Sequence, residues 1–428
     1  MKLRIEEPKR VIWGISPWPA LWSMGEGAGT PSLYYTLKAL LNAGYEIHLF
    51  AANDDVSREE ETYEGIYFHR FKVRLEKQIG TLEGVAARTR CLRFFGIGLS
   101  QVLYVSLYTL AALRRARAEL KKARPSLLYA YGCYSAPAAY TLGRVHHIPN
   151  ITRLFGTYIT PRHLSSRLWL LRRWQEVLAF KLPCRYLIVT NDGSKGDEAA
   201  HKLGVPKERL KFWRNGVNTG MYNAFFDVAG FKKGLGLEAS SKIVLAVSRL
   251  VGWKHLERLI KGIPRVALEH KEVIFLIVGD GPEKTNLENL SQSLAVGKHI
   301  RFVGAVTHEK VADYMNAADI FASVNDFSNV SNGLYEAMAC GKCIVTLDSG
   351  ATGELIEDGK TGRLLRAGSE SEIVAELSEA IAGVLDDDVL RKALGENART
   401  YAQEHFQTWE ERTAMEVKLV AELVAKGG

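Results

Sequence analysis

The sequence predicts an α/β protein of two domains, each built on a doubly wound parallel β-sheet. The chain has 428 residues, which is too long for one ordinary hydrophobic core and fits two domains of roughly 200 residues. Short continuous apolar runs alternate with helix-like segments, a pattern typical of parallel strands covered by helices on both faces. The alternation breaks at KERLKFWRNGVNTGMYN. We therefore expect one domain over residues 1–215, a second over 216–405 and a final helical segment over 406–428.

The pattern begins with a strand at Arg10–Ser16, a glycine-rich loop, a helix and a second strand. Further apolar runs with the length of buried strands follow at Ser126–Tyr131, Arg185–Thr190, Lys242–Ser248, Glu272–Gly279, Ile300–Gly304, Asp319–Val324 and Lys342–Leu347. In doubly wound sheets, ligands bind at the carboxyl ends of the strands, where helix N-termini converge. Two such domains that face each other are expected to bind a substrate in the cleft between them.

Composition indicates a globular protein with a basic N-terminal half. The apolar fraction is 47% and the charged fraction 24%. Residues 1–200 hold 28 Lys and Arg against 17 Asp and Glu, whereas the remainder holds 28 against 31. A basic half attracts nucleic acid, an anionic membrane or phosphorylated small molecules. Because no zinc-finger, helix-turn-helix or aromatic RNA-binding signature accompanies the charge, we expect no nucleic-acid partner.

Five cysteines in a long chain favour reduced thiols and a cytoplasmic location. Cys340 and Cys343 form a CGKC string, which we interpret as buried small residues beside a strand rather than as a redox or metal site. No metal site is expected in the acidic run Asp386–Asp388 either, because it has the pattern of a helix start.

Three segments bear on membranes. The N-terminus places carboxylates and a proline between its basic residues and its apolar run, which is wrong for a signal peptide. Phe94–Leu113 has no charge for 20 residues, but its polar residues and glycines favour a partly buried helix over a span. Trp169–Arg185 mixes Arg with Trp and Leu, as interfacial helices do. Together with the basic N-terminal half, this last segment predicts that the protein makes peripheral contact with an anionic membrane surface.

Two cations follow a strand in SRLVGWKH. Arg249 and Lys254 would stabilise negative charge that grows on the β-phosphate when a sugar leaves a nucleoside diphosphate. The alternative is an ordinary surface pair. Downstream, Gly279 and Gly281 in VGDGPE let a base or ribose approach the backbone, or only form a tight turn. Val303, at the end of another strand, would present its backbone to a base edge.

The segment SNVSNGLYEAMACG predicts a helix N-terminus that binds an anion. Ser331 or Asn332 is the expected N-cap, and the amides of Gly333 and Leu334 would point at a phosphate. Glu336 lies one turn into the helix, where it would accept hydrogen bonds from ribose hydroxyls or only stabilise the helix dipole.

The ordered motifs RNGVNTGMYN, VSRLVGWKHLERLIKG, LIVGDGPEKTNL, IRFVGAVTHEKVADYMNAADIFA and NGLYEAMACGKCIVTLDSGATGELIEDGKTGRLL resemble glycosyltransferase family 4. The resemblance covers the C-terminal half and is looser in the N-terminal half. It implies the GT-B fold of two Rossmann-like domains, a final helix that returns to the N-terminal domain, and transfer of a sugar with retention of configuration. It also implies no divalent metal and no cofactor beyond the nucleotide-sugar co-substrate.

By this resemblance, Arg249, Lys254 and Glu336 carry the catalytic contacts, and the Gly333–Leu334 amides bind the α-phosphate. Gly27 and Gly29 would face them across the cleft. The remaining donor-binding residues are expected to be Gly279, Gly281, Val303, Ser328, Asn329, Ser331 and Asn332. The acceptor is unidentified; a lipid-linked or polysaccharide intermediate fits the family.

The chain departs from the family pattern at two positions. Ser328 stands where many members have a first glutamate near the transferred sugar, although Asn325, Asp326 and Asn329 lie close by. Phe155 and Gly156 stand where many members have a histidine, so Arg153 and Thr157 are only candidate acceptor residues. Two other functions therefore stay open, a GT-B nucleotide-sugar epimerase and an inactive nucleotide-sugar-binding subunit.

Overall fold

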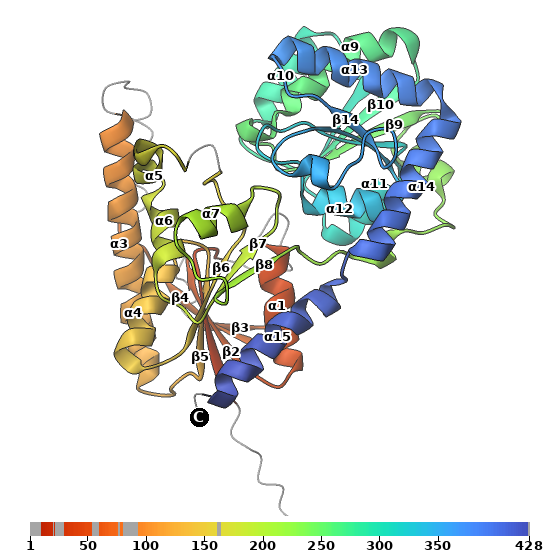
Figure 1. Cartoon of the computed structure of the whole chain (residues 1–428). Helices are drawn as coiled ribbons and strands as arrows, with labels where there is room; N and C mark the ends of the chain where they lie inside the picture. The colour runs from red at the N-terminus through yellow and green to blue at the C-terminus, as the bar shows by residue number, and fades with distance from the viewer. Residues whose placement is uncertain are drawn as a thin grey trace, which may run out of the picture. The chain divides into compact units, whose positions relative to one another are not determined.

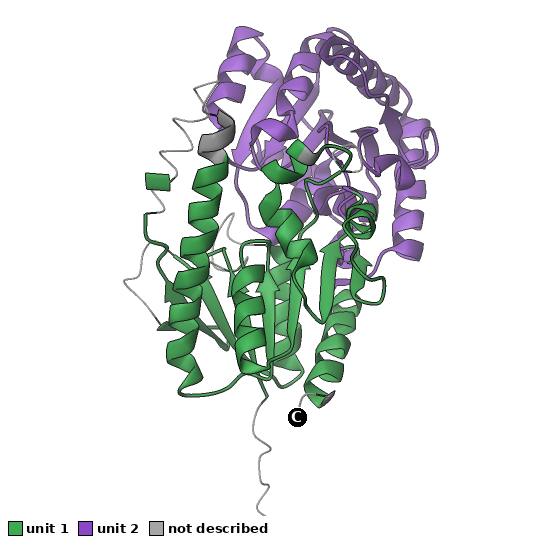
Figure 2. Ribbon diagram, turned by 60° about the vertical axis from the view of Figure 1, so that its left-hand side comes forward, with its two compact units in different colours: residues 1–191, 195–214, 410–428 green, residues 192–194, 215–409 purple. Residues whose placement is uncertain are grey.

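The computed structural model describes residues 10–19, 21, 30–53, 60–75, 78–79, 93–160 and 164–426. The chain forms two compact units (Figure 2). Unit 1 comprises Met1–Asn191, Lys195–Arg214 and Glu410–Gly428, and unit 2 comprises Asp192–Ser194 and Asn215–Trp409. The division therefore falls beside the boundary expected at residue 215, and the C-terminal segment belongs to the same unit as the N-terminus.

Unit 1 has an eight-stranded sheet in the order β3-β4-β2-β1-β5-β6-β7-β8 (Figure 1). All neighbours are parallel except β3 and β4, which form an antiparallel hairpin at one edge. The strands are β1 (Val11–Ser16), β2 (Glu46–Ala52), β3 (Glu60–Tyr63), β4 (Ile66–Phe71), β5 (Leu127–Tyr131), β6 (Asn150–Leu154), β7 (Tyr186–Thr190) and β8 (Leu210–Trp213).

Helices pack on both faces of this sheet. The described helices of unit 1 are α1 (Pro31–Asn42), α3 (Arg93–Leu120), α4 (Ala136–His146), α5 (Arg167–Arg172), α6 (Trp174–Lys181), α7 (Gly196–Lys202) and α15 (Trp409–Lys426). Side chains of α1 and α15 share one buried cluster with the sheet, and those of α3 and α4 share another. Each central strand is therefore buried on two sides, which is why its sequence is a continuous apolar run.

Unit 2 has a six-stranded parallel sheet in the order β11-β10-β9-β12-β13-β14. Its strands are β9 (Lys242–Val247), β10 (Val273–Val278), β11 (Ile300–Gly304), β12 (Ile320–Ser323), β13 (Cys343–Leu347) and β14 (Arg363–Leu365). The strand order reverses between β9 and β12, so the crossovers on either side of this point leave a crevice at the carboxyl edge, where doubly wound sheets bind ligands.

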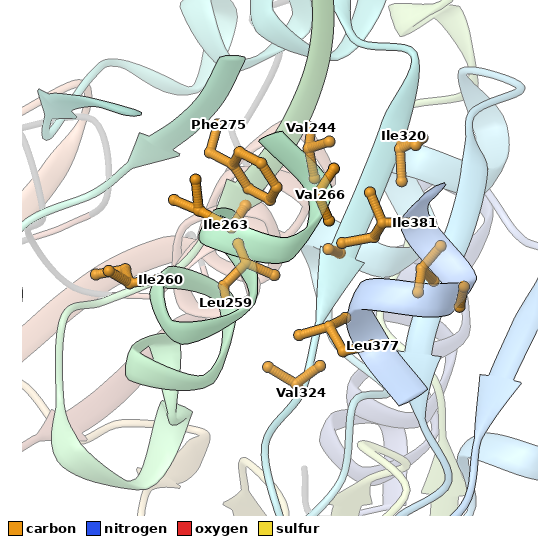
Figure 3. Packing of buried hydrophobic residues seen from close by; sticks show 14 of the residues in the cluster. Val244, Leu259, Ile260, Ile263, Val266, Phe275, Ile320, Val324, Leu377 and Ile381 are labelled. Carbon is orange, nitrogen blue, oxygen red and sulfur yellow. The ribbon is translucent and has the colours of Figure 1, made fainter. Parts of the chain in front are cut away.

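The helices of unit 2 also cover both faces of their sheet. They are α8 (Val228–Gly234), α9 (Leu256–Glu269), α10 (Lys284–Ser293), α11 (His308–Ala317), α12 (Asn332–Ala339), α13 (Glu370–Asp386) and α14 (Asp388–His405). Figure 3 shows Leu259 and Ile263 of α9, Leu377 and Ile381 of α13 and Phe275 of β10 within one buried hydrophobic cluster. The acidic run predicted a helix start, and Asp387 indeed caps α14 and Asp388 is its first residue, whereas Asp386 is the last residue of α13.

The segment Phe94–Leu113 lies within α3, a helix of 28 residues. Tyr108 and Ala112 are buried against the sheet, whereas Leu99 and Leu110 on the other side are exposed. The segment is thus the partly buried helix that we expected. Within the part of the chain that the structure describes, no helix has the length and apolar character of a membrane span.

The two cysteines of the CGKC string lie at a helix end and a strand start. Cys340 follows α12 and Cys343 begins β13, and each is 1% exposed. Burial raises the pKa of both thiols to about 12. Both are therefore protonated core residues, as the sequence predicted.

Candidate functional site

Two cations follow β9 at the carboxyl edge of the unit 2 sheet. Arg249 is exposed, and Lys254 is partly buried with its Nζ 4.3 Å from the centroid of the Trp253 ring. Burial and the nearby charge of Arg249 lower the pKa of Lys254 to about 8, and the charge of Asp192 partly offsets them. The two side chains thus concentrate positive charge at the edge where the sequence predicts an anion.

Asp192 belongs to this site, although the sequence does not single it out. It follows β7 in the chain, but its contacts place Asp192–Ser194 in unit 2. Ser194 donates to Asp192 Oδ1 through its backbone N–H (3.1 Å) and through its hydroxyl. Burial raises the pKa of Asp192 to about 6, although the hydrogen bonds and the charge of Lys254 act in the opposite direction. Asp192 is therefore a carboxylate that modulates the charge of Lys254.

Gly279 and Gly281 lie where the turn after β10 meets the turn after β9. Leu250 N–H donates to Asp280 O at 2.9 Å across the two turns. Gly279 has a φ of 138°, and a Cβ on it would lie 1.9 Å from Ser248 O. A Cβ on Gly281 would lie 2.3 Å from Leu250 O. The approach of the two turns therefore requires both glycines, independently of any contact with a ligand.

The N-terminus of α12 is capped as the sequence predicts. Ser331 is the N-cap, and its Oγ accepts from Leu334 N–H at 3.3 Å. Asn215 Nδ2 donates to Asn332 Oδ1 at 3.0 Å, which orders the first helical residue. The N–H of Leu334 is thus committed to the cap, whereas the N–H of Gly333 has no partner among the described residues. The Gly333 amide is therefore the donor that this helix end offers to an anion.

Glu336 is held by a histidine that the sequence analysis did not identify. His308 Nε2 lies 2.7 Å from Glu336 Oε1, and the two side chains are 13% and 8% exposed. Burial lowers the pKa of His308, but the hydrogen bond to Glu336 and its charge outweigh burial, so the pKa is raised. The sequence signal that could have identified His308 is its position four residues after the predicted strand Ile300–Gly304.

Ser328 and Asn329 lie in the loop between β12 and α12, and both are buried. Asn329 is completely buried, its amide donates to Leu347 O at 2.8 Å, and its Oδ1 accepts from the Asn325 side chain at 2.9 Å. Through these hydrogen bonds, the Asn329 side chain holds the loop between β12 and α12 in place. Val303, in β11, is half buried against the neighbouring apolar cluster.

Arg153 lies in β6 of unit 1 and is fully buried. Its Nη1 is 2.5 Å from Glu416 Oε1 and 2.9 Å from Thr36 Oγ1. Arg412 Nη1 is 2.9 Å from the same Glu416 oxygen, and Tyr129 donates its hydroxyl to the carboxylate. Arg153 therefore anchors α15 to the sheet of unit 1, and its contact with an acceptor stays a prediction.

Thr157 lies in the loop after β6 and is also buried. Its hydroxyl donates to Glu176 Oε2 at 2.8 Å, and the same oxygen accepts from Tyr158 N–H at 2.9 Å. Burial raises the pKa of Glu176. These contacts fix the loop at the carboxyl end of β6. Gly27 and Gly29 lie outside the described residues.

Within the described ranges, two groups of side chains bring a histidine and two carboxylates within metal-ligand reach: Glu60, His69 and Glu119, and Glu269, His270 and Asp386. In the first group, the Arg115 guanidinium lies 2.6 Å from Glu119 and 2.8 Å from Glu60, so it fills the space between the ligand atoms. The second group lies on the surface, away from the carboxyl edge of the sheet. Neither group belongs to the site around Lys254.

Comparison with known families covers most of both units. Residues 30–220 match the family described as Glycosyltransferase Family 4, and residues 229–401 match the family described as Glycosyl transferases group 1.

Among similar curated proteins, the N-acetyl-alpha-D-glucosaminyl L-malate synthase of Bacillus anthracis is 23% identical over 374 residues, which cover 87% of this chain and 88% of that protein. The GDP-mannose-dependent monoacylated alpha-(1-6)-phosphatidylinositol monomannoside mannosyltransferase of Corynebacterium glutamicum is 30% identical over 191 residues, covering 43% of this chain and 48% of that protein. An uncharacterized glycosyltransferase of Methanocaldococcus jannaschii is 32% identical over 180 residues, 42% and 44% of the two chains. The chain thus spans less than half the length of the last two relatives.

Two solved structures share the fold over nearly the whole chain. Sucrose-phosphate synthase from Thermosynechococcus elongatus has a TM-score of 0.74 at 21% identity, covering 98% of this chain and 100% of that one. An Anabaena protein, HepE, in complex with UDP and glucose has a TM-score of 0.68 at 18% identity, covering 97% and 100%.

Proposed function

Because the chain belongs to glycosyltransferase family 4 and has the GT-B fold, we propose that it transfers a sugar from a nucleoside-diphosphate sugar to an acceptor, with retention of configuration. The observation that carries the proposal is the pairing of Arg249 and Lys254 at the carboxyl edge of the unit 2 sheet, the edge at which α12 begins with the Gly333 N–H, for which the described residues supply no partner. Each of these groups suits one part of a nucleoside diphosphate.

The chemical step needs stabilisation of the leaving group. When the bond between the sugar and the β-phosphate breaks, negative charge grows on the phosphate oxygens. Backbone hydrogen bonds from Val251 N–H to Arg249 O and from Lys254 N–H to Val251 O order the turn that carries both cations. Two fixed cations replace a divalent ion in this role, and we propose that the reaction is independent of metal.

The nucleotide is proposed to bind along the N-terminus of α12. The Gly333 N–H, with the positive end of the helix dipole, would bind the α-phosphate. Glu336 Oε2 has no partner among the described residues, and we propose that it accepts from the ribose hydroxyls. Gly279, Gly281 and Val303 would then line the region of the base.

The sugar and the acceptor are less constrained. The Anabaena structure contains UDP and glucose, and the Corynebacterium relative is named for GDP-mannose, so uridine and guanosine donors are the first candidates here. Ser328, in place of a carboxylate, gives the sugar a neutral neighbour. We propose a lipid-linked or polysaccharide intermediate as the acceptor.

Peripheral contact with the cytoplasmic face of an anionic membrane is proposed as a second feature. Leu168 and Leu171 of the short helix α5 are 64% and 65% exposed, and Arg172 beside them is exposed too. Exposed leucines next to cations are typical of segments that lie at a lipid interface. The excess positive charge of residues 1–200 acts in the same direction.

Release of nucleoside diphosphate from UDP-, GDP- and ADP-sugars tests the proposal, with and without lipid-linked acceptors. We expect turnover with one donor, and we expect the turnover rate to fall at least about a hundredfold in the Arg249→Ala, Lys254→Ala variant. The matched control replaces Arg265 and Lys271, which are exposed on the same unit. Tight donor binding without turnover under every acceptor would favour the inactive subunit, and an equal loss in the control would remove the assignment of the two cations.

A further inference from the structure

Two helices meet at the carboxyl edge of unit 2 through one hydrogen bond between their side chains. His308 is the first residue of α11, which follows β11 at the end of the sheet, and Glu336 lies in the first turns of α12, which follows β12. His308 Nε2 and Glu336 Oε1 are 2.7 Å apart. The contact therefore joins two crossovers that are separate in sequence.

The chemistry of the two groups fixes the direction of this bond. An ionised carboxylate only accepts, so Nε2 of His308 carries the proton and donates it to Oε1. The second oxygen, Oε2, is not bonded to any described residue. Oε2 is not among the fully buried side-chain atoms that lack a partner, so it remains accessible to the hydroxyl of a ligand. The bond thus leaves Glu336 with one oxygen committed and the other available.

The charges around His308 also favour the hydrogen bond from His308 to Glu336. Burial lowers the pKa of His308, but the hydrogen bond to Glu336 and the negative charges of Glu336 and Glu309 outweigh burial and raise the pKa. When His308 is protonated, its positive charge reduces the repulsion between Glu336 and a bound diphosphate. His308 therefore satisfies the carboxylate without removing its capacity to accept from a hydroxyl.

We propose that His308 is a positioning residue that holds Glu336 in the orientation needed to accept hydrogen bonds from the donor ribose. The inference rests on the proposed function, since it assumes that Glu336 contacts the ribose. His308 itself does not touch the donor in this account. Its loss is expected to weaken donor binding and to raise the donor KM while kcat changes little.

The experiment measures binding of UDP, GDP and ADP, and compares the tightest of them with its 2′-deoxy and 3′-deoxy analogues. His308→Phe keeps a planar ring without a donor, and His308→Gln places an amide donor near the position of Nε2. We expect His308→Phe to bind the nucleotide about tenfold more weakly and to lose most of the preference for the ribose form. His308→Gln should retain most of the nucleotide affinity and most of the preference for the ribose form.

Lys310→Gln, an exposed change on the same helix, controls for the loss of one positive charge. Equal binding and equal ribose preference in wild type and His308→Phe would overturn the inference. If His308→Gln behaved as His308→Phe, positioning through the hydrogen bond would also be wrong. A wild type that binds no nucleotide, or that does not distinguish ribose from both deoxyriboses, would contradict the proposed function instead.

Discussion

The substitution Glu416→Gln removes the negative charge that joins α15 to the sheet of unit 1. Glu416 is 1% exposed, and its Oε1 lies 2.5 Å from Arg153 Nη1 and 2.9 Å from Arg412 Nη1. Gln keeps the volume but leaves two buried guanidinium groups without a counterion. Removal of one partner of a buried ion pair costs about 3–5 kcal/mol of unfolding free energy, and we expect about 3 kcal/mol because Gln still accepts a hydrogen bond.

Urea unfolding followed by tryptophan fluorescence measures this loss, because unit 1 contains Trp13, Trp174 and Trp213. A chain of two units unfolds in more than one transition, and the shift should be confined to that of unit 1. The matched control is Glu422→Gln, an exposed change on the same helix that should stay within about 0.5 kcal/mol of wild type. Equal stability of the two variants would refute the ion-pair argument.

The pH dependence provides a second check on the same residue. Burial alone would raise the pKa of Glu416, but the charges of Arg153 and Arg412 outweigh it and hold the pKa below its ordinary value. A carboxyl with a lower pKa in the folded chain adds stability above the unfolded pKa, and this is lost as the pH falls through the folded pKa. The difference between wild type and Glu416→Gln should therefore shrink below about pH 4. A constant difference down to pH 3 would contradict the account.

Three further predictions concern the donor site and the membrane. Because the pKa of Lys254 is lowered to about 8, nucleotide affinity should be constant below that pH and fall above it. Lys254→Arg should keep the affinity constant to higher pH, because Arg stays charged. Calorimetry from pH 6.5 to 9.5 measures both effects. Gly279→Ala should destabilise unit 2 by about 2 kcal/mol or more in urea, whereas Gly297→Ala, with nothing within 4 Å of its Cβ, should be close to neutral. Replacement of Leu168 and Leu171 by Gln should reduce flotation with vesicles that contain phosphatidylglycerol, and unchanged flotation would remove α5 from the contact.

Strands β1, β2, β5, β7 and β9–β13 could be predicted because each is a short continuous apolar run. Strands β3, β4, β8 and β14 were not predicted; β3 (Glu60–Tyr63), for example, is an exposed edge whose sequence carries no apolar run. The domain division differs from the prediction at residues 406–409, which belong to unit 2, and at Asp192–Ser194, three residues of unit 2 between two segments of unit 1. Such a crossing leaves no local signal in composition or periodicity.

The candidate site was predictable where a motif is contiguous and unpredictable where two distant segments meet. The capped start of α12 follows from Ser331 and the residues after it. The roles of His308 and Asp192 depend on contacts with Glu336 and Lys254, which lie on other crossovers. The contacts of Arg153 could not be predicted either, because its partner Glu416 is 263 residues away and its burial could not be read from neighbouring residues.

The most direct test of the account compares calorimetric binding of a nucleoside diphosphate, the monophosphate and the nucleoside to wild type and to the Arg249→Ala, Lys254→Ala variant. If the two cations hold the β-phosphate, wild type should bind the diphosphate much more tightly than the monophosphate, and the variant should lose that difference while it still binds the nucleoside. Wild-type affinity of the variant for the diphosphate would contradict the assignment of the donor site and, with it, the proposed mechanism of sugar transfer.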